Sequence, residues 1–362
     1  MAGAASGELT GGAGRRVAAA RLARLGEWIP WVVIVGLGAW AAIALTDQFV
    51  IGVIVGSLYA LSAVGLTLIY GIARVSHFAQ GDAMMLFAYL AFFVMTGTVA
   101  GIGSADATLP LSLDLLPGAS EKLWRFSFGY GLILAVIAAA LLAVPILLAI
   151  DRVVYQPLQR RGASTAIVAV ASLGVAITMR GAMLLIWGPG GRRYAKGIRD
   201  TVDLPGLPRI VADQLFIIGM AAVLAAATYL LLYRTRLGTA MRATADNPDL
   251  ARASGIDTAA TRRWTWAIGG ALTAVAGCLL ALQSQLSPEL GFVLLLPIFA
   301  AAILGGIGSP HGAFIGGLIV GIIGEVTVGA GIVAPGYKLA VTFVVLILVI
   351  LRWPNGLFGA RS

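Results

Sequence analysis

Charged side chains are scarce in this chain of 362 residues, which holds 25 Lys and Arg and 16 Asp and Glu residues. They make up 11% of the sequence, whereas hydrophobic residues make up 59%. A soluble domain has about a quarter of its residues charged, because water must solvate its surface. The deficit excludes an ordinary soluble protein. We therefore expect a membrane protein whose exterior is largely solvated by lipid.

Several kinds of chemistry are also missing. Cys278 is the only cysteine, which excludes a disulfide framework and cysteine-based zinc or redox pairs. His77 and His311 are far apart, and the sequence contains no nucleotide-binding P-loop, H-E-x-x-H or G-x-S-x-G motif. We expect no enzyme activity, no metal and no cofactor bound by this chain. The net charge of +9 does not indicate nucleic acid, since the basic residues are scattered in short loops without interleaved aromatic residues.

Long apolar runs predict an all-α membrane protein, a polytopic helical bundle with about 8–10 transmembrane segments, since a helix of about 20 residues spans a bilayer. The candidate spans are residues 28–46, 49–70, 79–97, 128–150, 165–187, 214–233, 265–284, 291–308, 312–330 and 338–352. The glycine-rich junction at residues 305–312 joins either two full spans or a re-entrant pair. Residues 1–27 are predicted to be a disordered cytoplasmic tail, followed by a transmembrane domain over residues 28–362.

The distribution of basic residues predicts the orientation. With the N-terminus inside the cell, the inner segments carry about twice as many Lys and Arg residues as the outer segments. Positive charge is enriched in cytoplasmic loops, so both termini are expected in the cytoplasm of a multi-pass protein of the cell membrane. The outer loop at residues 188–213 is basic and opposes this bias. Residues 98–127 are predicted to form an irregular extracytoplasmic excursion.

The inner loop at residues 234–264 contains a well-specified short helix over residues 248–254. Asn247 is a suitable N-cap, and Pro248 suits the first helical position. Asp249 complements the positive helix end, and Gly255 can adopt the left-handed conformation that ends a helix. So short a helix needs a packing partner. It is either an ordinary interfacial helix or a docking element for a cytoplasmic protein.

Polar residues within the spans are candidates for a solute pathway, because such residues usually face a bundle interior or a water-filled path. They comprise Ser57, Tyr59, Ser62, His77, Gln80, Asp82 and Arg180, with Glu325 as a further ionisable group. Hydrogen bonding between helices is the alternative explanation for the uncharged members. Asp82 could reach water at the inner end of its span, and Arg180 could extend to the outer interface. Gly306 and Gly308 mark the best candidate for a functional helix break.

Four groups of residues together resemble the permease subunits of branched-chain amino-acid ABC importers, which are related to the urea importer permeases. The first is Tyr59-Ala-Leu with Tyr70-Gly71 and His77-Phe-Ala-Gln-Gly-Asp82, and the second is Asp151-Arg-Val-Val-Tyr-Gln-Pro-Leu158 with Ser172-Leu-Gly and Trp187-Gly-Pro. The third is Thr235-Arg-Leu-Gly-Thr-Ala-Met-Arg-Ala243 with Ala251-Arg-Ala-Ser-Gly-Ile-Asp257. The fourth is Leu304-Gly-Gly-Ile-Gly-Ser309, Gly312-Ala and Arg352-Trp-Pro-Asn-Gly-Leu-Phe-Gly359. His77 and Gln80 depart from the family's usual Asn and His.

The resemblance implies a transporter subunit that imports a small polar solute by alternating access, with branched-chain amino acids as the leading candidate. Urea or another amide is the alternative solute, and an ion-coupled secondary transporter is a more distant one. The implied partners are a second permease subunit, two cytoplasmic ATP-binding subunits that use ATP and Mg²⁺, and a soluble extracytoplasmic solute-binding protein. The implied ATPase-coupling residues lie within residues 235–257 and are Arg242, Asn247, Pro248, Asp249, Arg252 and Gly255.

Overall fold

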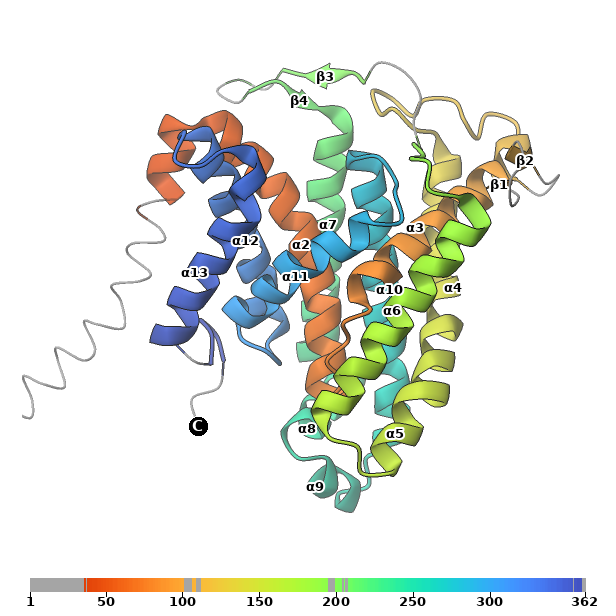
Figure 1. The fold of residues 1–362 in the computed structure, drawn as a ribbon, viewed down its shortest axis with the longest axis vertical. Coiled ribbons are helices and arrows are strands. Elements are labelled where there is room, and N and C mark those ends of the chain that lie inside the picture. The colour runs from red at the N-terminus through yellow and green to blue at the C-terminus, as the bar shows by residue number, and fades with distance from the viewer. Residues whose placement is uncertain are drawn as a thin grey trace, which may run out of the picture.

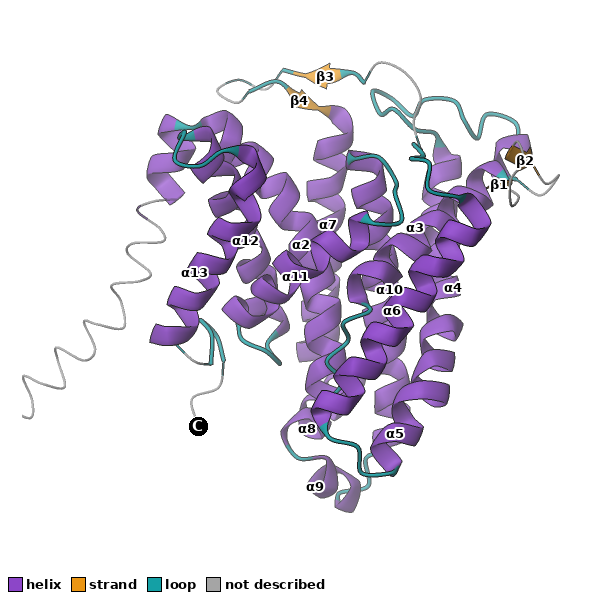
Figure 2. Ribbon diagram, viewed as in Figure 1, coloured by secondary structure: helices purple, strands orange, loops and turns teal. Residues whose placement is uncertain are grey.

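The computed structural model describes residues 36, 38–100, 106–108, 112–194, 199–203, 205, 208–353 and 355–359. Within these residues the structure is mainly helical, and the strands form two short antiparallel hairpins (Figure 2). The predicted tail at residues 1–27 lies outside the described residues, as do residues 28–35 and 37 of the predicted first span at residues 28–46. The prediction of an all-α polytopic bundle is confirmed.

Seven of the described helices are long and apolar enough to cross a membrane. They are α2 (Thr46–Ala73), α4 with its continuation (Tyr130–Arg160), α6 (Thr165–Trp187), α7 (Ala212–Arg234), α10 (Thr258–Gln283), α12 (Pro310–Gly329) and the stretch of η3 and α13 (Pro335–Arg352). The continuation of α4 (Tyr130–Ile150) consists of a π-helical turn, η2 (Asp151–Tyr155), and α5 (Gln156–Arg160). The last stretch combines a 3₁₀ turn, η3 (Pro335–Tyr337), with α13 (Lys338–Arg352).

Two further apolar helices, α3 (Gln80–Thr96) and α11 (Leu290–Gly305), are shorter. At 1.5 Å per residue each is about 25 Å long, which is less than the roughly 30 Å hydrocarbon core. Both run obliquely between neighbouring long helices (Figure 1). The predicted spans at residues 79–97 and 291–308 are therefore short helices within the bundle.

Successive connections alternate between the two ends of the bundle (Figure 1). One end, here called the hairpin end, carries β1 (Thr98–Ala100) paired with β2 (Asp106–Thr108), η1 (Leu113–Leu115), and β3 (Thr201–Val202) paired with β4 (Ile210–Val211). The opposite end, here called the α8/α9 end, carries α8 (Arg236–Asp246) and α9 (Pro248–Ala253). This alternation agrees with the predicted order of inner and outer loops.

Helix α2 is the centre of the bundle, and α12 packs along it at very short range. A Cβ atom on Gly317 would overlap the backbone of Ala60, and one on Gly321 would overlap the backbone of Gly56. Small residues let helix backbones approach closely, and in lipid this contact replaces the hydrophobic effect as the source of helix association. The late glycine cluster therefore includes positions whose side chain must be a hydrogen atom.

Candidate functional site

Helix α9 has the ends that the sequence predicts. The Asn247 side-chain oxygen accepts hydrogen bonds from the backbone N–H groups of Asp249 at 3.1 Å and Leu250 at 3.0 Å. Pro248 is the first helical residue, and Gly255 follows the helix with a φ of 85°. The cap satisfies two backbone donors that a helix start otherwise leaves without partners. The predicted short helix at residues 248–254 is confirmed.

Helix α9 presents a mixed polar and apolar surface away from the bundle. Leu250 is 64% exposed, although the neighbouring Ala251 is buried. Asp249 and Arg252 are also exposed and form an ion pair at 3.6 Å. The exposed face of α9 thus combines Asp249, Leu250 and Arg252.

Two contacts join this segment to the membrane-spanning helices. The Arg74 guanidinium, at the end of α2, donates a hydrogen bond of 2.8 Å to the backbone oxygen of Ala245. The Arg242 guanidinium on α8 lies 4.9 Å from the ring centre of Tyr233 on α7. Helix α8 itself was not predicted, although Thr235 caps it by accepting a hydrogen bond of 3.1 Å from the Gly238 N–H. Displacement of α8 and α9 would therefore act directly on α2 and α7.

Asp82 and Arg180 form an ion pair inside the bundle. Arg180 Nε donates to Asp82 Oδ1 at 2.9 Å, and Arg180 Nη2 donates to Asp82 Oδ2 at 3.0 Å. Asp82 is fully buried, and the Arg180 side chain is 23% exposed with its guanidinium 4.6 Å from the Phe292 ring centre. In this structure Asp82 does not reach solvent, and the Arg180 side chain turns to Asp82. The two opposite charges compensate each other inside the bundle.

Gln80 lies at a polar contact of three helices. Its side-chain nitrogen donates to the Ser62 backbone oxygen at 3.1 Å, to Ser62 Oγ at 3.2 Å and to Thr273 Oγ1 at 2.8 Å. These bonds connect α3 with α2 and α10. The Gln80 side-chain oxygen is buried and has no hydrogen-bond partner among the described residues. Gln80 and Ser62, both predicted pathway residues, are thus brought together as a link between helices.

His77 belongs to a separate buried group. Its Nδ1 atom is 3.1 Å from the Tyr155 hydroxyl, which donates a hydrogen bond of 3.2 Å to Ser172 Oγ. The Ser172 hydroxyl also accepts a hydrogen bond of 3.1 Å from the Ala79 N–H. The Trp266 ring packs edge-on against the His77 ring, with 5.3 Å between the ring centres. The short segment before α3 is anchored to η2, α6 and α10 in this way.

The remaining candidates on α2 do not join either group. The Ser57 hydroxyl donates to the Val53 backbone oxygen at 2.7 Å, within its own helix, and Tyr59 is buried. The predicted pathway residues therefore fall into several clusters in this structure, and their part in a solute pathway stays a prediction.

The predicted helix break at residues 305–312 separates α11 from α12. Gly306 and Gly308 have φ angles of 101° and 92°, which side chains with a Cβ rarely adopt. The Leu357 N–H donates to the Leu304 backbone oxygen at 2.8 Å, so a residue near the C-terminus satisfies a carbonyl at the end of α11. Gly308 also lines a cavity of about 430 Å³ whose walls include Arg242 on α8.

Comparison with known proteins places these features in a family. The family model described as "Branched-chain amino acid transport system / permease component" matches residues 48–350. This chain belongs to that family.

The high-affinity branched-chain amino acid transport system permease protein BraD of Pseudomonas aeruginosa is 32% identical over 324 residues, which cover 86% of this chain and 95% of that protein. The corresponding LivH protein of Salmonella typhimurium is 32% identical with the same coverages. A probable LivH protein of Methanocaldococcus jannaschii is 30% identical over 85% of this chain and 90% of its own length. No solved structure matches the chain significantly.

The structure also explains family motif residues for which the sequence suggested no role. Asp151 on η2 is buried and accepts a hydrogen bond of 2.9 Å from Arg262 Nε on α10. Arg262 Nη1 donates to Gln159 Oε1 at 2.7 Å, and Gln159 in turn donates to the Ala73 backbone oxygen at 3.0 Å. This permease thus holds α2, α5 and α10 together at the α8/α9 end through one charged network.

Two more carboxylates find partners in this family member. Glu325 on α12 pairs with Lys338 at the start of α13, so it links helices at the hairpin end. Asp213 at the start of α7 accepts a hydrogen bond of 2.8 Å from the Ser127 N–H and lies 3.7 Å from Arg199 Nε. The signal available for Asp213 was a carboxylate at the start of an apolar span, preceded by a loop rich in basic residues.

Proposed function

We propose that this chain is the membrane-spanning permease subunit of an ATP-driven importer for branched-chain amino acids. The observation that carries the proposal is the similarity to permease proteins of that name over 86% of the chain. The sequence contains no P-loop nucleotide-binding motif, and the proposed source of energy is a separate ATP-binding subunit. Urea is a weaker candidate, because none of the relatives named above is a urea permease.

The α8–α9 segment is proposed to receive that energy. An ATP-binding subunit would dock on the exposed face of α9 around Asp249, Leu250 and Arg252. The caps at Asn247, Pro248 and Gly255 hold this face in shape. Movement of the segment would pull on α2 through Arg74 and on α7 through Arg242, because those side chains bridge the two parts. The bundle would then alternate between outward-open and inward-open states.

The proposed complex contains a second permease subunit, two ATP-binding subunits and an extracytoplasmic solute-binding protein. In the proposed orientation the α8/α9 end faces the cytoplasm and the hairpin end faces the binding protein. Basic residues at the α8/α9 end support this orientation. They include Arg152, Arg160, Arg161, Arg234, Arg236, Arg242, Arg252, Arg262 and Arg263. Both termini are proposed to be cytoplasmic.

The identity of the transported solute is tested by competition between labelled and unlabelled solutes. The complete complex is expressed in cells that lack their own branched-chain amino-acid uptake, and entry of labelled leucine is measured. Unlabelled isoleucine and valine at a hundredfold excess should abolish entry, whereas urea at the same excess should not. Entry of labelled urea that leucine fails to suppress would contradict the assignment. An inactive complex with a substitution in the ATP-binding subunit gives the background.

A further inference from the structure

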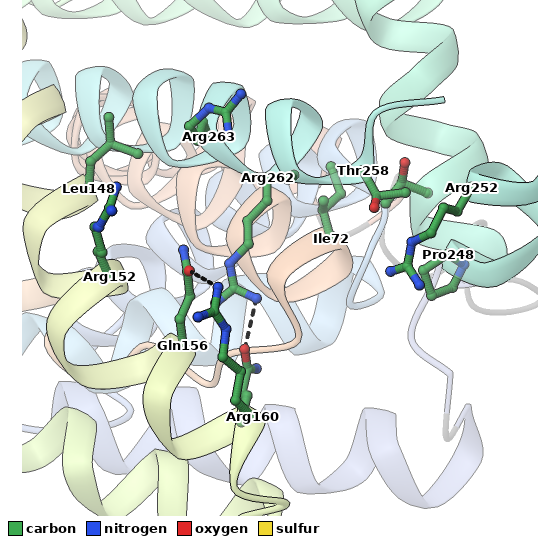
Figure 3. A pocket seen from close by; sticks show the side chains of 13 residues that line it. Ile72, Leu148, Arg152, Gln156, Arg160, Pro248, Arg252, Thr258, Arg262 and Arg263 are labelled. Atoms are coloured by element: carbon green, nitrogen blue, oxygen red, sulfur yellow. Dashed lines mark hydrogen bonds between the residues drawn. The ribbon is translucent and has the colours of Figure 1, made fainter. Parts of the chain in front are cut away.

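The α8/α9 end contains a cavity of about 790 Å³ between the continuation of α4, the α8–α9 segment and the start of α10 (Figure 3). Arginines dominate its walls, and no described Asp or Glu lines it. The arginines are Arg152, Arg160, Arg252, Arg262 and Arg263. Figure 3 shows Arg152 and Arg160 on one wall and Arg262 reaching toward them from α10.

Nearby carboxylates offset only part of this charge. Asp151 pairs with Arg262, Asp249 with Arg252 at 3.6 Å, and Asp257 with Arg263 at 4.0 Å. Within the part of the chain that the structure describes, Arg152 and Arg160 have no ion-pair partner. Arg160 Nη2 only approaches Gln156 Oε1 at 3.5 Å. The cavity thus keeps two uncompensated guanidinium groups and attracts an anion.

The shape of the donors favours phosphate. A guanidinium group presents parallel N–H donors that match the oxygens of a phosphate group. Gln156, Gln159 and Thr258 add uncharged polar groups to the same cavity. The cavity volume is far larger than a single inorganic ion requires, so the anion is expected to be part of a larger molecule.

The membrane-facing surface of α4 leads into this cavity. Leu141, Pro145, Leu148 and Arg152 follow one another at spacings of four, three and four residues, which places them on one helix face. Leu141 is 68% exposed and Pro145 is exposed, whereas Leu148 and Arg152 line the cavity. An apolar stripe for an acyl chain therefore ends at a basic site for a headgroup.

An exposed tryptophan marks the depth of the site. Trp264 is 54% exposed and follows Arg263 on α10. Tryptophan is enriched where lipid headgroups meet the hydrocarbon core, so the arginines lie at headgroup depth. Basic pockets between spanning helices on the cytoplasmic side suit anionic lipid headgroups.

We propose that this cavity binds the phosphate headgroup of an anionic phospholipid, with an acyl chain along the Leu141–Pro145–Leu148 stripe. The location in the inner leaflet rests on the orientation under Proposed function, whereas binding itself does not. Because Pro248 and Arg252 of α9 share the cavity with Arg152 and Arg160, the lipid would connect α9 to the end of α4. Lipid composition would then influence how firmly the coupling segment is held.

The test compares R152Q/R160Q with R161Q/R236Q, a control that removes the same charge from exposed arginines outside the cavity. The purified complex is delipidated and titrated with phosphatidylglycerol or phosphatidylcholine, and bound lipid is counted by native mass spectrometry. Loss of two arginines at headgroup depth should weaken phosphatidylglycerol binding about 30-fold. The control should bind as the unmodified complex does. R152K/R160K keeps the charge but loses the paired donors, so it should bind more weakly than the unmodified complex and more tightly than R152Q/R160Q.

Competition identifies the source of the phosphate. Glycerol phosphate and inorganic phosphate at tenfold excess should not displace phosphatidylglycerol, because they lack the acyl chain. Equal phosphatidylglycerol binding by R152Q/R160Q and its control would overturn the proposal. Displacement by either soluble phosphate would assign the site to a soluble anion. Absence of phosphatidylglycerol binding by the unmodified complex would also overturn the proposal. The leucine competition assay is independent of all these outcomes.

Discussion

Arg180 on α6 forms an ion pair with Asp82 on α3 inside the membrane-spanning bundle, through two hydrogen bonds of 2.9 and 3.0 Å. Asp82 has no exposure to solvent, whereas the Arg180 side chain keeps 23% of its surface accessible. The two partners are therefore unequal. Asp82 depends on Arg180 for charge compensation, but Arg180 retains an alternative route toward the headgroup region.

This asymmetry predicts the result of removing each partner. R180Q should destabilise the complex by about 3 kcal/mol, because it leaves a buried carboxylate without a counter-charge. D82N should cost less, since Arg180 can turn toward the interface. The double variant D82N/R180Q should recover much of the loss, and thermal unfolding of the purified complex measures all three. A double variant less stable than R180Q would contradict this description of the pair.

The close contact of α2 and α12 predicts an effect of a single methyl group. Gly321→Ala would push a Cβ atom into the Gly56 backbone, so the helices must separate, at about 1–3 kcal/mol. Gly219→Ala on α7 is the matched control, because no atom lies within 4 Å of its Cβ position. The control should be neutral or slightly stabilising. Equal unfolding temperatures for the two variants would show that the contact is not tight.

The end of α9 predicts a variant that uncouples ATP hydrolysis from transport. Gly255→Val puts a β-branched residue at a φ of 85°, with about 1–3 kcal/mol of backbone strain that should distort α9. ATP hydrolysis should persist while leucine uptake falls at least tenfold. Gly331→Val, between α12 and η3, is the matched control, because its φ is 70° and no atom lies within 4 Å of its Cβ position, as at Gly255. A Gly255→Val complex with an unchanged ratio of uptake to hydrolysis would remove α9 from the coupling path.

Short-range patterns in the sequence were sufficient for the spans, their alternation and the ends of α9. Hydropathy decides the position of a span, and Asn247, Pro248 and Gly255 act on backbone groups only a few residues away. Helix α8 was missed because it is a polar helix with few apolar residues, even though Thr235 caps it. The shortness of α3 and α11 depends on how neighbouring helices cross, which local composition does not encode.

Ion pairs between residues far apart in the chain could not be predicted from the sequence. Asp82 and Arg180 are 98 residues apart, and Asp151 and Arg262 are 111 apart. Each residue is conspicuous as a charge in or beside an apolar run, but nothing local indicates its partner. The same limit applies to Gln80, whose contacts with Ser62 and Thr273 come from two other helices. Polar residues that were grouped as one pathway consequently lie in separate clusters, each of which joins different helices.

The source of energy is the claim on which the proposed function depends, and uptake into proteoliposomes tests it most directly. The complete complex is reconstituted with its binding protein outside and the ATP-binding subunits facing the lumen, and labelled leucine is added outside. Accumulation should require ATP in the lumen and should be unaffected when a proton ionophore collapses any pH gradient. Accumulation that follows an imposed proton gradient in the absence of ATP would contradict the account.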